Sequence, residues 1–268
     1  MDSQTNDSLD LSKAPLLSHL IELRRRLLYC LGFFLVVFAG AYCVADELYQ
    51  FLQQPLVSAF GGEQSGRKMI YTGLHEAFFT YLKLAMFAAL FVTLPLILMQ
   101  VWKFLAPGLY RSERKAISPL FVLTPVLFVM GAALAFYVVM PLAWQFFISF
   151  EHTAPSNGIS LALEARVSEY LSLVIKLILA FGLSFELPIL LLVMAKAGMV
   201  TADGLRRHRR HAIVVTFLFS ALITPPDLIS QIALGLPIVL LYEMSIWLIG
   251  WTGSDREALA REAASSGT

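Results

Sequence analysis

Charged residues are scarce in this chain of 268 residues. Only 15% of the residues are Asp, Glu, Lys or Arg, whereas 58% are hydrophobic, and the mean hydropathy is +0.72. A soluble domain of this length needs a larger charged surface, so the composition excludes one. It indicates a protein that crosses a membrane several times.

Cysteine is also rare, since the chain contains only two. Cys30 and Cys43 fall in one apolar run, where their separation corresponds to about 20 Å of helix. A disulfide needs Cα atoms within about 7 Å of each other, so these two residues cannot be bridged. We interpret both as small residues of the buried core.

Several enzyme motifs are missing as well. The chain contains no G-x-x-x-x-G-K-[ST] phosphate loop, no paired-cysteine zinc spacing and no H-E-x-x-H. These absences argue against an ATPase or a metalloenzyme. His208 and His211 lie in a basic cluster that disfavours a bound cation, so contact with lipid headgroups explains them better. We therefore predict a protein that is not an enzyme, with no catalytic residue, metal or cofactor.

Long apolar runs fill most of the chain. Residues 27–45, 77–101, 116–147 and 170–195 can each cross a hydrocarbon core of about 30 Å as a helix. The third of these runs contains several prolines, so we expect a bent helix there.

Two further uncharged runs, residues 212–223 and 228–242, are short. As helices they reach only about 18 and 22 Å. They predict an antiparallel pair turned at Pro225 and Pro226, although residues 247–251 are apolar enough to lengthen the last span. We predict an all-α polytopic membrane protein with six transmembrane helices, the last two short.

The N-terminal segment ends in three arginines ahead of the first apolar run, which resembles a secretory signal peptide. The run at 27–45 is longer than the apolar part of an ordinary signal and more apolar runs follow, so we interpret it as a retained span. Leu16, Leu20 and Leu23 recur at helical spacing, so we expect an amphipathic helix on the membrane surface before this span. After the span, a similar pattern predicts an interfacial helix that ends near Pro55.

Lysine and arginine are distributed unevenly between the two sides. Fifteen lie in the N-terminal segment, the loops after the second and fourth runs and the tail, whereas the opposite loops hold three. The positive-inside rule therefore places both termini in the cytoplasm. We divide the chain into a disordered N-terminal segment at 1–15, one transmembrane domain at 16–251 and a disordered tail at 252–268.

Glu186 is unusual because it lies inside the fourth apolar run. The only other charge there is Lys176, about 15 Å away along a helix. Pro188 cannot donate a backbone hydrogen bond and frees the carbonyl of Ser184, which loosens the helix beside the carboxyl group. A carboxyl group at this depth indicates a functional site by default. The alternative is a protonated or hydrogen-bonded side chain that only holds helices together.

Two acidic residues on the predicted cytoplasmic side, Glu22 and Glu113, have basic neighbours. They are candidates for binding a cationic group. Each also has a structural explanation, because Glu22 can pair with Arg26 at i+4 and Glu113 can stabilise a helix start after a Ser112 cap. Spacing alone leaves both interpretations open.

Four segments suggest a known family. They are HLIELRRRL at His19–Leu27, LAPGLYRSER at Leu105–Arg114, FGLSFELP at Phe181–Pro188 and LITPPDLISQ at Leu222–Gln231. In order and topology they resemble the signature segments of the TatC family, the multispan receptor subunit of the twin-arginine protein translocase. The resemblance extends from about residue 16 to residue 251. It implies a multi-pass protein of the bacterial cytoplasmic (inner) membrane.

The resemblance also implies roles for individual residues. Glu22 and Glu113 would receive the arginine pair of a cargo signal peptide, and Glu186 would line a concave face within the bilayer. The triple arginine departs from the family pattern and affects the local pairing of Glu22. Supporting roles in the signal surface or the fold fall to Arg24, Pro55, Phe104 and Tyr110, and an external cap of the last two spans would contain Asp227 and Gln231.

Further expectations follow from the same resemblance. The chain would bind signal peptides of folded cargo and nucleate a multimeric complex with the single-span subunits TatA and TatB, driven by the proton-motive force. An alternative from another class is a secondary transporter that uses Lys83, Lys176 and Glu186 as a proton or solute path. Such transporters commonly contain internal repeats, and we find none here.

Overall fold

A computed structural model describes the backbone of residues 4–62, 68–105, 111–151, 163–224 and 228–265, and the side chains of residues 21–62, 68–101, 123–151, 163–224 and 228–251. This part of the chain is helical, apart from short connections and one isolated bridge between Ile70 and Arg166. The helices are α1 (Gln4–Cys43), α2 (Ala45–Ala59), α3 (Glu76–Leu105), α4 (Arg111–Leu134), the π-helix η3 (Ala135–Val139), α5 (Met140–Ile148), α6 (Val167–Ser184), α7 (Leu187–Lys196), α8 (Ala202–Arg207), α9 (Arg209–Ile223) and α10 (Leu228–Ser265).

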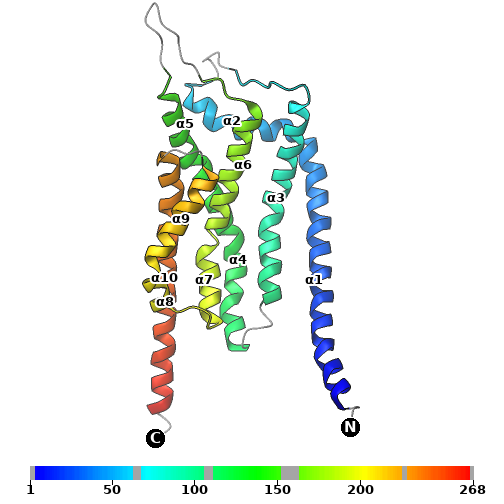
Figure 1. Ribbon diagram of the computed structural model, residues 1–268, viewed down its shortest axis with the longest axis vertical. Coiled ribbons are helices and arrows are strands. Elements are labelled where there is room, and N and C mark those ends of the chain that lie inside the picture. The colour runs from blue at the N-terminus through cyan, green and yellow to red at the C-terminus, as the bar shows by residue number, and fades with distance from the viewer. Residues whose placement is uncertain (1–3, 63–67, 106–110, 152–162, 225–227, 266–268) are drawn as a thin grey trace, which may run out of the picture.

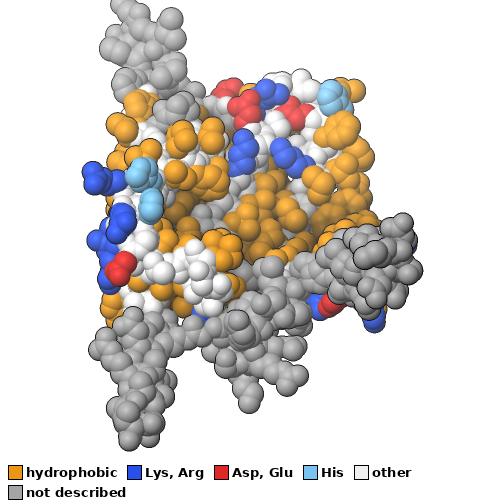
Figure 2. Space-filling model, turned by 60° about the horizontal axis from the view of Figure 1, so that its bottom comes forward, with side chains coloured by type: hydrophobic (Ala, Val, Ile, Leu, Met, Phe, Trp, Pro, Cys, Tyr) orange, Lys and Arg blue, Asp and Glu red, His pale blue; other side chains and the backbone are white. Residues whose placement is uncertain are grey.

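The long helices run side by side along one axis (Figure 1). α1 stands at one edge and contacts α3, α4 and α6 occupy the middle, and α9 and α10 form the opposite edge. α2 lies across one end of the bundle, and both chain termini lie at the other end. We call these the α2 end and the terminal end. The outer surface between them is largely hydrophobic (Figure 2), as a membrane-embedded bundle requires.

Five helical segments in the described residues are long and apolar enough to cross a membrane. They lie in α1, α3, α4 with η3 and α5, α6 with α7, and α10. α9 has 15 residues and is shorter than these spans, as predicted. The prediction of a short last span is wrong, because the apolar part of α10 continues past Glu243 and covers Leu228–Trp251. Glu243 interrupts the uncharged run but not the helix, since its carboxylate accepts a bond from Arg209 at 2.7 Å.

The first two helices also differ from prediction. α1 continues without a break from Gln4 to Cys43, so its N-terminal part does not form a separate surface helix. No proline or glycine lies between Leu16 and Leu31 to end it. α2 crosses the end of the bundle but continues past Pro55 to Ala59, because the proline ring is buried in the core and removes only one hydrogen bond.

Cys43 is exposed and Cys30 is only partly buried, so the prediction that both belong to the core is wrong. Both are free thiols, as their spacing predicts. α1 has one packed neighbour along most of its length, and it therefore leaves most of its surface outside the core. The predicted disorder of residues 1–15 and 252–268 stays a prediction, although α1 and α10 extend into both segments.

The core forms where α6 packs against α4, η3 and α5. Phe181 and Val174 of α6 and Met140 of α5 are fully buried there. Tyr170, near the start of α6, donates from its hydroxyl to the carbonyl of Leu52 at 2.7 Å and so attaches α2 to the bundle. The π-helical turn η3 precedes Pro141, which is consistent with the predicted bend of this span.

Glycine permits the close approach of α4 and α6. A Cβ atom on Gly131 would lie 2.5 Å from the carbonyl oxygen of Phe181, and one on Gly182 would lie 2.6 Å from the ring of Phe128. Each helix therefore presents a glycine to a phenylalanine of the other, which brings the two backbones close together.

Candidate functional site

Glu22 and Arg26 form an ion pair one turn apart on α1. Arg26 donates from Nη2 and Nε to Glu22 Oε1 at 2.5 and 3.1 Å. Its Nη1 donates to Oε1 of Gln100 on α3 at 2.7 Å. The side chain of Glu22 is 42% exposed and that of Arg26 is 24% exposed. The i+4 pairing that the spacing allows is therefore present. It orients an accessible carboxylate beside the last turns of α3, at the terminal end of the bundle.

Glu113 lies in the first turn of α4, where an acidic residue stabilises the start of a helix. α3 ends and α4 begins at the terminal end, so the backbone places Glu113 at the same end of the bundle as Glu22 (Figure 1). The side chains of Glu113 and Phe104 lie outside the described part, and so does the whole of Tyr110. A shared site of Glu22 and Glu113 therefore stays a prediction.

Basic side chains lie next to Glu22 on the outer face of α1. Arg24 and Arg25 are exposed and, with Tyr29, line a shallow hollow of about 380 Å³. Arg25 donates from Nε to the Tyr29 hydroxyl at 3.4 Å, and its guanidinium lies 5.6 Å from the centre of the ring. Tyr29 thereby holds Arg25 along the helix, while Arg24 keeps positive charge within two residues of Glu22.

Glu186 lies between α6 and α7, where the backbone leaves the regular helix. α6 ends at Ser184 and α7 begins at Leu187, so the helix that was predicted to be loosened beside Pro188 is divided in two. The Glu186 side chain is 6% exposed and is therefore buried between helices. Neither carboxyl oxygen forms a hydrogen bond with a described residue. The hydroxyl of Thr124, on α4, approaches closely enough for an electrostatic interaction but does not meet the geometry of a hydrogen bond.

The remaining predicted residues are distributed over the bundle. Pro55 is buried in α2. Gln231 lies in the first turn of α10 and donates from Nε2 to the carbonyl of Phe217 on α9 at 3.1 Å, so it connects the last two helices. Asp227 lies outside the described residues. Lys83 and Lys176 are exposed on α3 and α6, away from the buried Glu186.

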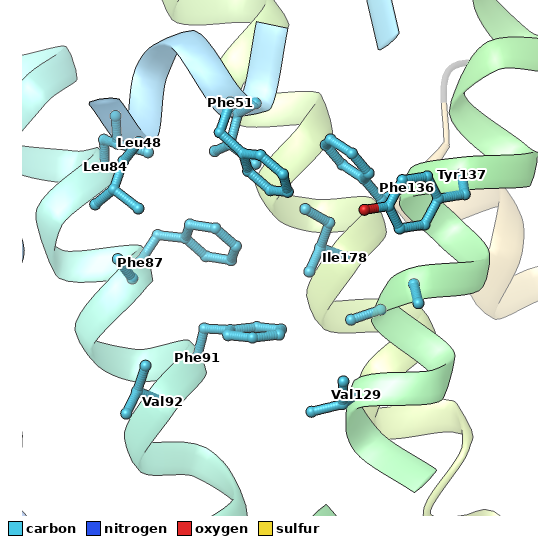
Figure 3. Close-up of a pocket in the computed structure, with 14 residues that line it drawn as sticks. Leu48, Phe51, Leu84, Phe87, Phe91, Val92, Val129, Phe136, Tyr137 and Ile178 are labelled. Carbon is cyan, nitrogen blue, oxygen red and sulfur yellow. The ribbon is translucent and has the colours of Figure 1, made fainter. Parts of the chain in front are cut away.

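An apolar cavity of about 310 Å³ lies between α2, α3 and the α4 span (Figure 3). Phe87 and Phe91 of α3 point toward Phe136 and Val129 across it. Its lining is hydrophobic apart from the hydroxyl of Tyr137, so it offers no ligand for a metal and no nucleophile. No group of three or more potential metal ligands occurs among the described residues.

Two polar contacts were not predicted from the sequence. One is the contact of Gln100 with Arg26. The available signal in the sequence was a polar side chain near the end of an apolar run, at the same end of the bundle as an arginine. The other is Glu76, which accepts bonds from Ser168 at 2.6 Å and Arg166 at 3.3 Å at the α2 end. This contact joins the start of α3 to the start of α6, two segments that are distant in the sequence.

Comparison with known proteins identifies the family to which this helical bundle belongs. Residues 18–237 match the family model of the Sec-independent protein translocase protein TatC. The chain belongs to the TatC family. A TatC of Magnetococcus marinus is 48% identical over 254 residues, which cover 94% of this chain and 89% of that protein. TatC of Escherichia coli is 38% identical over 233 residues, which cover 87% of each protein.

Solved structures agree with this assignment. A crystal structure of the twin-arginine translocase receptor TatC matches this TatC-family chain with a TM-score of 0.73 at 33% identity, covering 87% of this chain and 98% of that chain. A second crystal structure of that receptor, in the detergent DDM, gives a TM-score of 0.74 at 34% identity and covers 86% and 99%. The resemblance in the four sequence segments is therefore confirmed. The chain is a multi-pass membrane protein of a Sec-independent protein translocase family, whose members are transport components and not known enzymes.

Proposed function

We propose that this TatC-family chain is the receptor for twin-arginine signal peptides, with Glu22 and Glu113 as a shared site for two guanidinium groups. The network of Glu22, Arg26 and Gln100 is the observation that carries the proposal. It holds an accessible carboxylate in a defined position at the end of the bundle where α4 begins.

The chemistry of the guanidinium group explains why arginine is required. A guanidinium is a planar fork that meets a carboxylate through two parallel hydrogen bonds, whereas a lysine ammonium acts as a point charge. Arg24 and Arg25, within three residues of Glu22 on α1, repel a cationic peptide. Without the two acidic residues, the surface would therefore reject the signal by like charge.

The test is the affinity of an Arg-Arg signal peptide for purified wild-type protein and for Glu22→Gln and Glu113→Gln in nanodiscs. Each hydrogen-bonded charge contact is worth about 1.5–3 kcal/mol, so each variant is expected to bind about ten- to a hundred-fold more weakly. Binding of a Lys-Lys peptide, already poor, should change little. Glu47→Gln is the matched control, because it removes an exposed acid from α2 at the other end of the bundle.

The alternative roles of the two acids predict different outcomes. If Glu22 only stabilises α1 through Arg26, Glu22→Gln lowers the melting temperature and leaves peptide affinity unchanged. If Glu113 acts only at the helix start, the same holds for Glu113→Gln. Equal loss for the Arg-Arg and Lys-Lys peptides would indicate general electrostatic attraction in place of a guanidinium site.

We further propose that the receptor works in the bacterial cytoplasmic (inner) membrane with six spans, of which α9 is the short one, and with both termini in the cytoplasm. Its partners are the single-span subunits TatA and TatB, and the proton-motive force drives transport. Gln231 and Asp227 belong to the external cap of α9 and α10. Phe104 and Tyr110 support the surface around Glu113, and Glu186 acts after signal capture.

A solute or proton path through Lys83, Lys176 and Glu186 is not favoured. The two lysines are exposed, whereas Glu186 is buried and forms no hydrogen bond with a described residue that would extend a path toward them. Pull-down of a twin-arginine peptide against solute uptake in vesicles separates the two functions.

A further inference from the structure

A series of polar contacts descends from the α2 end where α3 packs against α6. At the surface, Glu76 accepts bonds from Arg166 and Ser168. One turn further along α6, the hydroxyl of Ser172 donates to the carbonyl of Ser168 at 2.5 Å and accepts a bond from Lys83 Nζ at 2.7 Å. We call these residues, together with Lys176, the polar seam.

Lys176 extends the seam deeper into the membrane. It follows Ser172 by four residues, so it lies on the same face of α6 about 6 Å further from the α2 end. Measured along the helices from their first residues, Lys83 lies about 10 Å and Lys176 about 14 Å inside the spans. Both side chains are exposed. Figure 2 shows basic side chains set in the hydrophobic surface next to a mixed patch of acidic and basic side chains.

The charges of the two lysines are not compensated within the described part of the chain. Its ion pairs join other residues, and the contact of Lys83 is to a hydroxyl group. A lysine in a lipid-facing position usually extends its ammonium toward the surface. Lys83 does so by bonding to Ser172, which lies nearer the α2 end than the Cα atom of Lys83. Two cations on neighbouring helices then face the membrane below the α2 end, where they attract an anion.

We propose that the polar seam binds the phosphate of an anionic phospholipid from the leaflet at the α2 end. The seam begins at the membrane surface and both of its lysines are exposed, so a headgroup at that surface meets charged groups without entering dry hydrocarbon. Its acyl chains remain beside the hydrophobic surface of α3 and α6. Basic pockets between transmembrane helices select anionic headgroups in this way. A partner helix could neutralise the lysines only if it carried an acidic side chain at the same depth as theirs. A phospholipid needs no such match, because its phosphate lies near the membrane surface by itself.

The test is the retention of phosphatidylglycerol by delipidated full-length protein in detergent, measured by native mass spectrometry. Removing one lysine, in Lys83→Gln or Lys176→Gln, is expected to weaken binding about fivefold, and removing both about twenty-five-fold. Phosphatidylcholine, whose phosphate is balanced by its own ammonium, should bind weakly to every form. Lys83→Arg and Lys176→Arg keep the charge and should retain the lipid.

Lys68→Gln is the matched control, because it removes an exposed lysine at the same end but outside the seam. Equal weakening by Lys68→Gln and Lys176→Gln would overturn the proposal in favour of general surface attraction. Unchanged lipid binding in the double variant, with loss of a co-purifying single-span subunit, would assign the lysines to a partner helix. Preserved cooperative unfolding of each variant shows that lost lipid does not reflect lost structure.

Discussion

The carboxyl group of Glu186 is surrounded by helices, and its oxygens have no hydrogen-bond partner among the described residues. Burying a polar group without a partner opposes folding. The carboxyl group lies where α6 ends and α7 begins, two residues before Pro188. A polar residue from a signal peptide or a partner helix would supply the missing bond, worth about 0.6–2 kcal/mol in a membrane.

Substitution of Glu186 should therefore separate capture from transport. Glu186 lies ten residues before the end of α7, about 15 Å from the terminal end. We expect Glu186→Ala to bind a twin-arginine peptide within about twofold of wild type, because the contacts at Glu22 are untouched. Transport of cargo into vesicles should fall several-fold. Glu186→Gln keeps a hydrogen-bonding group and should be less impaired; wild-type transport by both variants would make this residue purely structural.

At the scale of elements, the contact between α4 and α6 determines the shape of the core. Gly131 and Gly182 each face a phenylalanine of the opposite helix, so a side chain at either position needs the helices to move apart. In lipid, helix association depends on such close packing, because a membrane provides little hydrophobic driving force between helices. These two glycines should therefore be sensitive to the smallest enlargement.

We expect Gly131→Ala and Gly182→Ala to destabilise the bundle by about 1–3 kcal/mol each, the usual effect of overpacking a core. The measurement is the unfolding midpoint of purified protein in detergent. Gly40→Ala is the control, since a Cβ atom there meets nothing within 4 Å, and alanine should be neutral or slightly stabilising in a helix. Gly131→Ala as stable as Gly40→Ala would show that the helices tolerate a methyl group between them.

The elements could be predicted from the sequence to different degrees. Apolar runs indicated the long helices, and Pro188 indicated a loosened helix near Glu186, where the structure ends α6 and begins α7. The last span was predicted too short because Glu243 was counted as its end, and only the contact with Arg209 shows how the helix accommodates this charge. Gln100 could not be assigned to Arg26, because the pair is 74 residues apart and depends on how α1 packs against α3.

The whole molecule has both termini at one end and α2 at the other (Figure 1). The termini can share an end only if the chain crosses the membrane an even number of times, which agrees with the proposed six-span topology in which the short α9 counts as a span. Most lysine and arginine residues follow the same division, and their bias determines orientation. In the orientation that we propose, the terminal end, with Glu22 and the start of α4, faces the cytoplasm, where signal peptides are made.

Reporter fusions test this orientation directly. A phosphatase that is active only outside the cytoplasm should be active after Gly62, which lies at the α2 end, and inactive after Asp203 or Ser254. Green fluorescent protein, which fluoresces only in the cytoplasm in this assay, should give the reverse pattern, so poor expression of one fusion cannot imitate the result. If α9 did not cross, the fusions at Asp203 and Ser254 would report opposite sides. An active phosphatase after Asp203 would place the arginines after α8 outside the cytoplasm, against the positive-inside rule. The end of the bundle that carries Glu22 and Glu113 would then also lie outside, and the proposed receptor site would be wrong.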